Sequence, residues 1–163
     1  MKLLNEAVLE EKGEAPQPKP ECAVSLNVDA YIPEKYIRST AQRIDAYKKI
    51  ASVETEEDMQ DVYDELADRY GHLPKQADIL LKISLIRALG AAAYFDRIER
   101  QGGNVVMYTK TYSLERWRGL ISEYKGRLLL SAGNMPHVTL KLEPSKDIQE
   151  QILNLLKKYI QIS

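Results

Sequence analysis

The sequence contains few of the residues that build disulfides, metal centres or nucleotide sites. Its 163 residues include one cysteine and two histidines. The single Cys22 excludes a disulfide within the chain, and the two histidines offer no Cys/His spacing for a structural zinc ion. No Gly-rich loop ends in Gly-Lys-Ser or Gly-Lys-Thr, the signature of a common ATP site. We therefore expect no metal or cofactor bound by this chain, and the cysteine usage favours a reducing compartment, the cytoplasm.

Long apolar runs and a strong net charge are also missing. No stretch approaches the roughly 20 apolar residues of a membrane-spanning helix, so we expect no association with a membrane. The net charge of -1 gives no reason to expect a general nucleic-acid binder. Locally the charge is uneven, because acids dominate from Glu54 to Asp68 whereas basic residues dominate from Arg97 to Lys125. The sequence predicts one acidic face.

Three regions are predicted from composition. The apolar pattern of residues 1–13, which ends at Gly13, is typical of the last turns of a helix that belongs to a preceding region. Residues 14–21 carry three prolines and predict an extended linker. Residues 22–163 have the alternation of apolar and polar positions that a single compact domain requires.

The spacing of apolar residues within this domain predicts a strand, three helices, a hairpin, a helix, a second hairpin and a final helix. The predicted positions are a strand carrying Val24, Leu26 and Val28, helices beginning at Pro33, near Thr55 and at Pro74, a hairpin turning at Gly102-Gly103, a helix after Ser113, a hairpin turning near Gly133-Asn134, and a helix after Ser145. The helix from Pro74 is apolar on most sides and should occupy the centre. The predicted fold class is α+β, with a helical subregion packed against a small, largely antiparallel sheet.

The stretch DELADRYGHLP collects acids and a histidine near the end of the second helix. If Leu66 marks the buried face and each residue turns by about 100°, then Asp61, Asp64 and Asp68 lie nearly opposite, with Glu65 at the shoulder. Acid/base catalysis needs carboxylates with different pKa values in a cleft, which a solvated helix face does not provide. We therefore predict no catalytic residue here.

The residues alone leave three functions open. An acid/base enzyme would use Glu65, Asp68 and His72, a solvated helix end would only pair its acids with neighbouring arginines, and an interaction surface would present Glu65, Asp68, Asp61 and Asp64 to a basic partner. From the pattern alone a solvated helix end is the first expectation, although the density of acids favours an interaction surface more than it would on an ordinary helix. Such a surface would suit a free-standing adaptor for a basic protein.

Several motifs in the first half of the domain keep the order and spacing of a known family. They are Ile32-Pro33 with Tyr36-Ile37, then Arg43 with Tyr47-Lys48 and Ile50-Ala51, and then Glu65-Leu66, Asp68-Arg69-Tyr70-Gly71 and Leu73-Pro74. This pattern resembles the C-terminal domain of bacterial transcription-repair coupling factor (Mfd). The similarity is strongest from Asp29 to about Ala93 and weakens beyond it.

The resemblance implies a regulatory function. The full-length proteins of that family are ATP-driven DNA translocases that displace stalled RNA polymerase and recruit the repair protein UvrA. Their ATP, Mg and DNA sites lie in other domains, and none of the motor motifs occurs here. The C-terminal domain of the family docks on an N-terminal UvrB-like module and covers its UvrA-binding surface. By motif position, Glu65 and Asp68 would form the acidic half of that contact.

Overall fold

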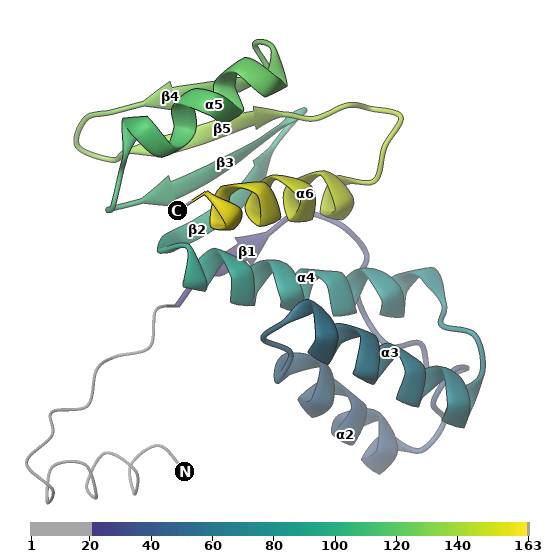
Figure 1. Cartoon of the computed structure of the whole chain (residues 1–163). Helices are drawn as coiled ribbons and strands as arrows, with labels where there is room; N and C mark the ends of the chain where they lie inside the picture. The colour runs from purple at the N-terminus through teal and green to yellow at the C-terminus, as the bar shows by residue number, and fades with distance from the viewer. Residues whose placement is uncertain (1–20, 163) are drawn as a thin grey trace, which may run out of the picture.

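The structure, a computed structural model, describes residues 21–162 (Figure 1). The helix end predicted for residues 1–13, and all but the last residue of the linker predicted for residues 14–21, lie outside this range. Within it, no helix is long and apolar enough to cross a membrane.

Five strands form one sheet in the order β1-β2-β3-β5-β4. They are β1 (Ala23–Ser25), β2 (Phe95–Gln101), β3 (Asn104–Thr109), β4 (Leu128–Ser131) and β5 (His137–Lys141). Every neighbouring pair is antiparallel except β1 and β2. The predicted α+β fold with a largely antiparallel sheet is therefore confirmed, and both predicted hairpins are present.

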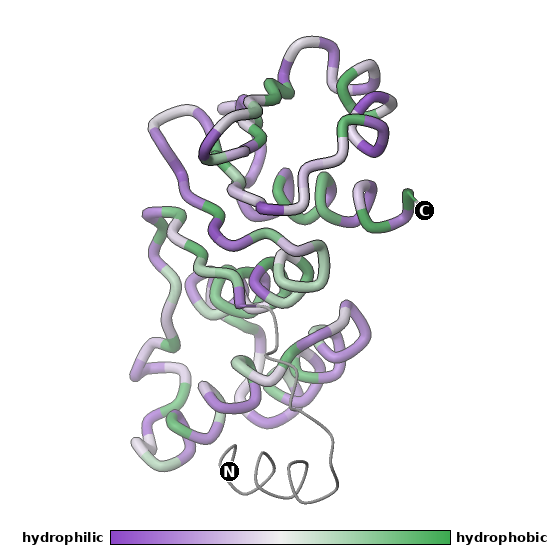
Figure 2. Tube along the Cα trace, turned by 90° about the vertical axis from the view of Figure 1, so that its left-hand side faces the viewer, coloured by the Kyte–Doolittle hydropathy of each residue, from purple (hydrophilic) through white to green (hydrophobic). Residues whose placement is uncertain are grey.

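The helices gather on one side of the sheet (Figure 1). They are α2 (Thr40–Ala51), α3 (Glu56–Tyr70), α4 (Lys75–Ala92), α5 (Leu114–Tyr124) and α6 (Ile148–Gln161). Helix α4 contacts β1, β2, α2, α3 and α6, and so it lies at the centre, as its apolar sequence predicts. Figure 2 shows the same arrangement by hydropathy, with α4 largely green and the outer helices α2 and α3 carrying more purple.

The core of the sheet layer contains an aromatic cluster that joins three separate elements. The ring of Trp117 on α5 stacks on Tyr159 of α6 with centroids 4.4 Å apart. Phe95 at the start of β2 lies 6.1 Å from Trp117 and 5.5 Å from Tyr159, centroid to centroid. All three side chains are nearly inaccessible to solvent. The cluster fixes α5 and α6 against the sheet and against each other.

Two local predictions are wrong. The helix expected from Pro33 begins only at Thr40, because residues after Pro33 form an isolated turn and Ser39 caps the helix by accepting a hydrogen bond from the backbone of Gln42. The strand expected to carry Val24, Leu26 and Val28 ends at Ser25, since the chain turns away at Asn27, which has a φ of 55°. In both places apolar residues such as Leu26 and Ile37 are buried in the core, but they lie in segments that are neither helix nor strand.

Candidate interaction surface

Helix α3 begins and ends where its sequence predicts, and this fixes the direction of every side chain on it. Thr55 accepts a hydrogen bond from the backbone N–H of Asp58, whose carboxylate accepts one from the backbone N–H of Thr55. This reciprocal pair is a capping box. The helix ends at Gly71, whose backbone φ of 91° is one that residues other than glycine rarely adopt.

The outer face of α3 carries a line of four carboxylates, which we call the acidic row. It consists of Glu57, Asp61, Asp64 and Asp68, spaced four, three and four residues apart, so that they share one side of the helix. All four are exposed, and within residues 21–162 none forms an ion pair with a lysine or arginine. Leu66 lies on the opposite side of the helix and is 2% exposed. The predicted placement of Asp61, Asp64 and Asp68 is thus confirmed, and the same spacing adds Glu57.

Glu65 is set apart from the acidic row. Its Oε1 atom accepts a hydrogen bond of 2.8 Å from Nζ of Lys49 on α2, and the same Nζ lies 3.5 Å from the carboxylate of Asp45. The hydrogen bond to Glu65 is the main cause that raises the pKa of Lys49. The cation beside Glu65 is therefore this lysine and not one of the neighbouring arginines, and Glu65 ties α3 to α2 while its side chain stays 43% exposed.

The end of α3 is held by a tyrosine from the first family motif. The hydroxyl oxygen of Tyr36 lies 2.8 Å from the carbonyl oxygen of Gly71 and 3.0 Å from that of Leu66. The Tyr36 ring also meets the ring of Tyr70 edge to face, with centroids 5.8 Å apart. The hydroxyl is the donor to these carbonyls, because a carbonyl oxygen can only accept, and burial raises the pKa of Tyr36. These contacts hold the backbone before Asp68, at Leu66, and after it, at Gly71.

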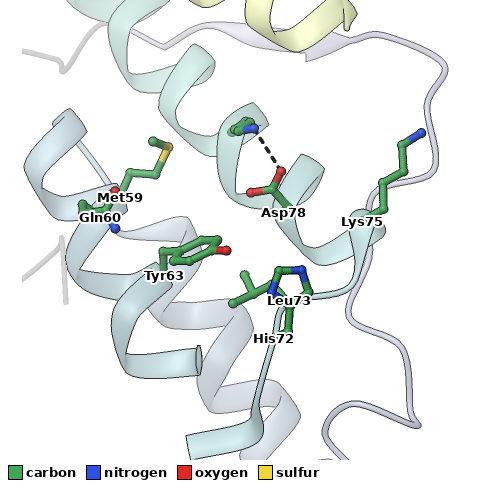
Figure 3. A pocket seen from close by; sticks show the side chains of 8 residues that line it. Met59, Gln60, Tyr63, His72, Leu73, Lys75 and Asp78 are labelled. Atoms are coloured by element: carbon green, nitrogen blue, oxygen red, sulfur yellow. Dashed lines mark ion pairs between the residues drawn. The ribbon is translucent and has the colours of Figure 1, made fainter. Parts of the chain in front are cut away.

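A cavity of about 510 Å³ opens between helices α3 and α4 (Figure 3), and we call it the α3–α4 pocket. It is lined by Met59, Gln60, Tyr63, His72, Leu73, Lys75, Asp78 and Lys82. His72 lines this pocket, but Glu65 and Asp68 do not. The structure therefore does not bring together the three residues that the enzyme hypothesis requires, and no cluster of three potential metal ligands exists among the described residues.

The acidic α3 and the tyrosine that holds its end both come from the stretch that carries the family motifs. A family model described as the TRCF domain matches residues 26–117, which include this stretch. The chain belongs to the TRCF domain family. Curated relatives agree: the transcription-repair-coupling factor of Staphylococcus haemolyticus is 35% identical over 119 residues, 72% of this chain and 10% of that protein. That of Bacillus subtilis is 39% identical over 83 residues, 50% of this chain and 7% of that protein.

This TRCF domain has the fold of a solved relative. The crystal structure of the C-terminal domain of transcription-repair coupling factor matches with a TM-score of 0.81, covering 90% of this chain and 96% of the other at 21% identity. The chain spans about a tenth of the length of its curated relatives or less. The family assignment suggested by the motifs is confirmed, and the matched length corresponds to one domain of those proteins.

Proposed function

We propose that this chain is the non-catalytic regulatory domain of a transcription-repair coupling factor. In this proposal the domain docks on the N-terminal UvrB-like module of the same cytoplasmic protein, covers the surface that binds UvrA, and restrains a translocase that acts on DNA and stalled RNA polymerase. ATP and Mg are bound by other parts of that protein.

The acidic row carries the proposal. Four exposed carboxylates on one side of α3 have no cationic partner among residues 21–162, and like charges at this spacing repel one another. A row of this kind attracts a basic surface and contributes more to the rate and orientation of docking than to tight affinity. A contact of modest affinity suits a restraint that must be released.

The individual carboxylates have different roles in this contact. Asp61, Asp64 and Asp68 face solvent and can each accept hydrogen bonds from arginines of the module. Glu65 is already held through Oε1 by Lys49, so it would offer its second oxygen from a fixed position at the edge of the surface. We place Asp68 at the centre of the contact with Glu65 beside it, as the motif positions imply.

The test is a binding titration of this chain against the separately expressed UvrB-like module. Asp64→Asn with Asp68→Asn should weaken binding and flatten its dependence on salt, since interactions between exposed charges are screened within about 10 Å at 0.1 M salt. The matched control is Asp96→Asn with Glu115→Gln, two exposed acids on β2 and α5 without ion pairs among the described residues. The control should bind like the parent.

A second measurement addresses the regulatory part of the proposal. In the full-length protein, the Asp64→Asn and Asp68→Asn pair should increase UvrA binding because the module is uncovered. Unchanged UvrA binding would refute the regulatory assignment. Binding of the chain to other basic proteins, but not to the module, would instead favour a free-standing adaptor.

A further inference from the structure

The α3–α4 pocket adjoins the acidic row through one side chain. Gln60 lines the pocket, and its Nε2 atom donates a hydrogen bond of 3.0 Å to the carboxylate of Asp64. Around the circumference of α3, at about 100° per residue, Gln60 lies between the pocket-lining Tyr63 and the acidic row. The pocket and the acidic row therefore form one continuous surface.

The base and the α3 wall of the pocket are apolar, whereas its α4 wall carries an ion pair in which Nζ of Lys82 lies 3.0 Å from the carboxylate of Asp78. Leu73, 4% exposed, lies at its base, and the half-buried side chains of Met59 and Tyr63 form the α3 wall (Figure 3). On the α4 side, His72 and Lys75 stand exposed at the rim. A lysine at this rim disfavours a second cation here, whereas the acidic row favours cations only a few residues away.

We propose that the α3–α4 pocket receives one apolar or aromatic side chain from the segment of the UvrB-like module that supplies cations to the acidic row. This inference rests on the proposed function and adds the partner's chemistry to it. The docking segment would carry a Leu-sized or aromatic residue next to its arginines or lysines. No arginine or lysine of that segment would contact the part of the pocket rim that carries Lys75, because the like charges would repel.

The energetic reason is that exposed charge pairs contribute little individually, about 0 to 1 kcal/mol each, and are screened by salt. An apolar side chain that fills a pocket contributes a salt-insensitive part, and interfaces commonly place such anchors beside a polar rim. The two parts of the surface can therefore be separated by measuring affinity at two salt concentrations.

The first experiment fills the pocket. His72→Trp places a large ring at the exposed rim of the pocket, and Ala132→Trp adds the same ring at an exposed position in the turn between β4 and β5 as a control. Titrations of each variant against the UvrB-like module are run at about 0.1 M and about 1 M salt. His72→Trp should lower the affinity by about tenfold or more at both concentrations, and Ala132→Trp should leave it unchanged.

The second experiment needs no substitution near the pocket. The chain has four methionines, and their methyl signals can be followed by NMR while the module is added. The Met59 methyl should shift on binding, whereas that of Met135, which is 62% exposed and lies in the β4–β5 turn, should not. This readout remains valid even if His72→Trp perturbs the fold.

The outcomes separate this inference from the proposed function. If Asp64→Asn with Asp68→Asn weakens binding but His72→Trp does not, or the Met59 methyl stays in place, the pocket holds no anchor and the acidic docking surface alone stands. If the module binds neither the parent chain nor any variant, the proposed function itself fails.

Discussion

The hydroxyl oxygen of Tyr36 lies 2.8 Å from the carbonyl oxygen of Gly71, a residue 35 positions later in the chain. This hydrogen bond joins the first family motif to the last turn of α3. The tyrosine thereby closes the helix that carries the acidic row, and it connects the isolated turn after Pro33 to the glycine at which the chain leaves α3. Two motifs that are distant in sequence therefore stabilise one helix end.

Removal of this hydroxyl should lower stability without disturbing the aromatic contact. Tyr36→Phe should reduce the free energy of unfolding by about 1 kcal/mol, the usual net value of one hydrogen bond. Urea denaturation measures the change. Tyr31→Phe is the control, since Tyr31 is 46% exposed. Equal effects of the two substitutions would show that the Tyr36 hydroxyl contributes nothing specific.

Gly90 on α4 is required by the close approach of Cys22, the residue before β1, and of Ile98 on β2. A Cβ atom at this position would lie 2.9 Å from Sγ of Cys22 and 3.1 Å from Cδ1 of Ile98. Gly90→Ala should therefore destabilise the domain by about 1 to 3 kcal/mol through overpacking, although alanine is the better helix former.

The same clash can be relieved from the other side. In a Cys22→Ala background the sulfur is absent, so Gly90→Ala should cost much less than it does in the parent. A double-mutant cycle by urea denaturation would measure this coupling. Additive effects would show that the sulfur is not the obstacle.

The single thiol should be unreactive while the chain is folded. Cys22 is 4% exposed, and burial, the largest cause, raises its pKa to about 12. Alkylating reagents attack the thiolate, which is scarce at such a pKa in mildly alkaline solution. Mass spectrometry after iodoacetamide treatment should show modification in urea and almost none without it. Fast modification of the native chain would contradict this packing of Cys22 against α4.

Glu143 should make stability sensitive to acid. Hydrogen bonding to Lys146, and then the charge of Arg127, lower the pKa of Glu143 below 4.5. Because the folded-state pKa is the lower one, the contribution of Glu143 is present above pH 4.5 and is lost as the pH falls through the folded value. Urea midpoints of Glu143→Gln should fall less than those of the parent between neutral and acidic pH. Parallel curves would contradict the assignment, and Glu115→Gln is the control.

The acidic row should lower the stability of the free domain. Its members lie three and four residues apart, a spacing at which like charges repel by about 0.2 to 0.5 kcal/mol per pair. Asp64→Asn with Asp68→Asn should therefore raise the urea midpoint slightly while it weakens docking. A lower midpoint would mean that these carboxylates serve the fold of the free chain. The change should shrink at high salt.

Elements determined by neighbouring residues were predictable from the sequence. Thr55 at the start and Gly71 at the end locate the limits of α3 to within one or two residues. Gly102-Gly103 likewise locates the β2–β3 hairpin, because a tight turn requires such residues. The outward direction of Asp61, Asp64 and Asp68 follows from helix geometry alone. The apolar character of α4 likewise indicated its central place.

Features that depend on distant partners were not predictable. The parallel pairing of β1 with β2 joins segments separated by three helices, and three residues of β1 contain no information about that partner. Pro33 is compatible with a helix start and equally with the isolated turn that forms. The ion pair of Glu65 with Lys49 and the pocket beside Gln60 both depend on how α3 packs against its neighbours. Helix geometry places Glu65 at the shoulder of the acidic face but does not identify Lys49 as its partner.

The aromatic cluster determines how much of the chain can be removed. The family model ends at residue 117, yet Trp117 stacks on Tyr159, and Ile152, Leu155 and Leu156 of α6 are completely shielded from water. A fragment trimmed to the matched segment would leave one side of α4 bare and lose the second hairpin of the sheet. The smallest fragment with a complete hydrophobic core therefore extends through α6, and a fragment chosen for expression should include the whole of this helix.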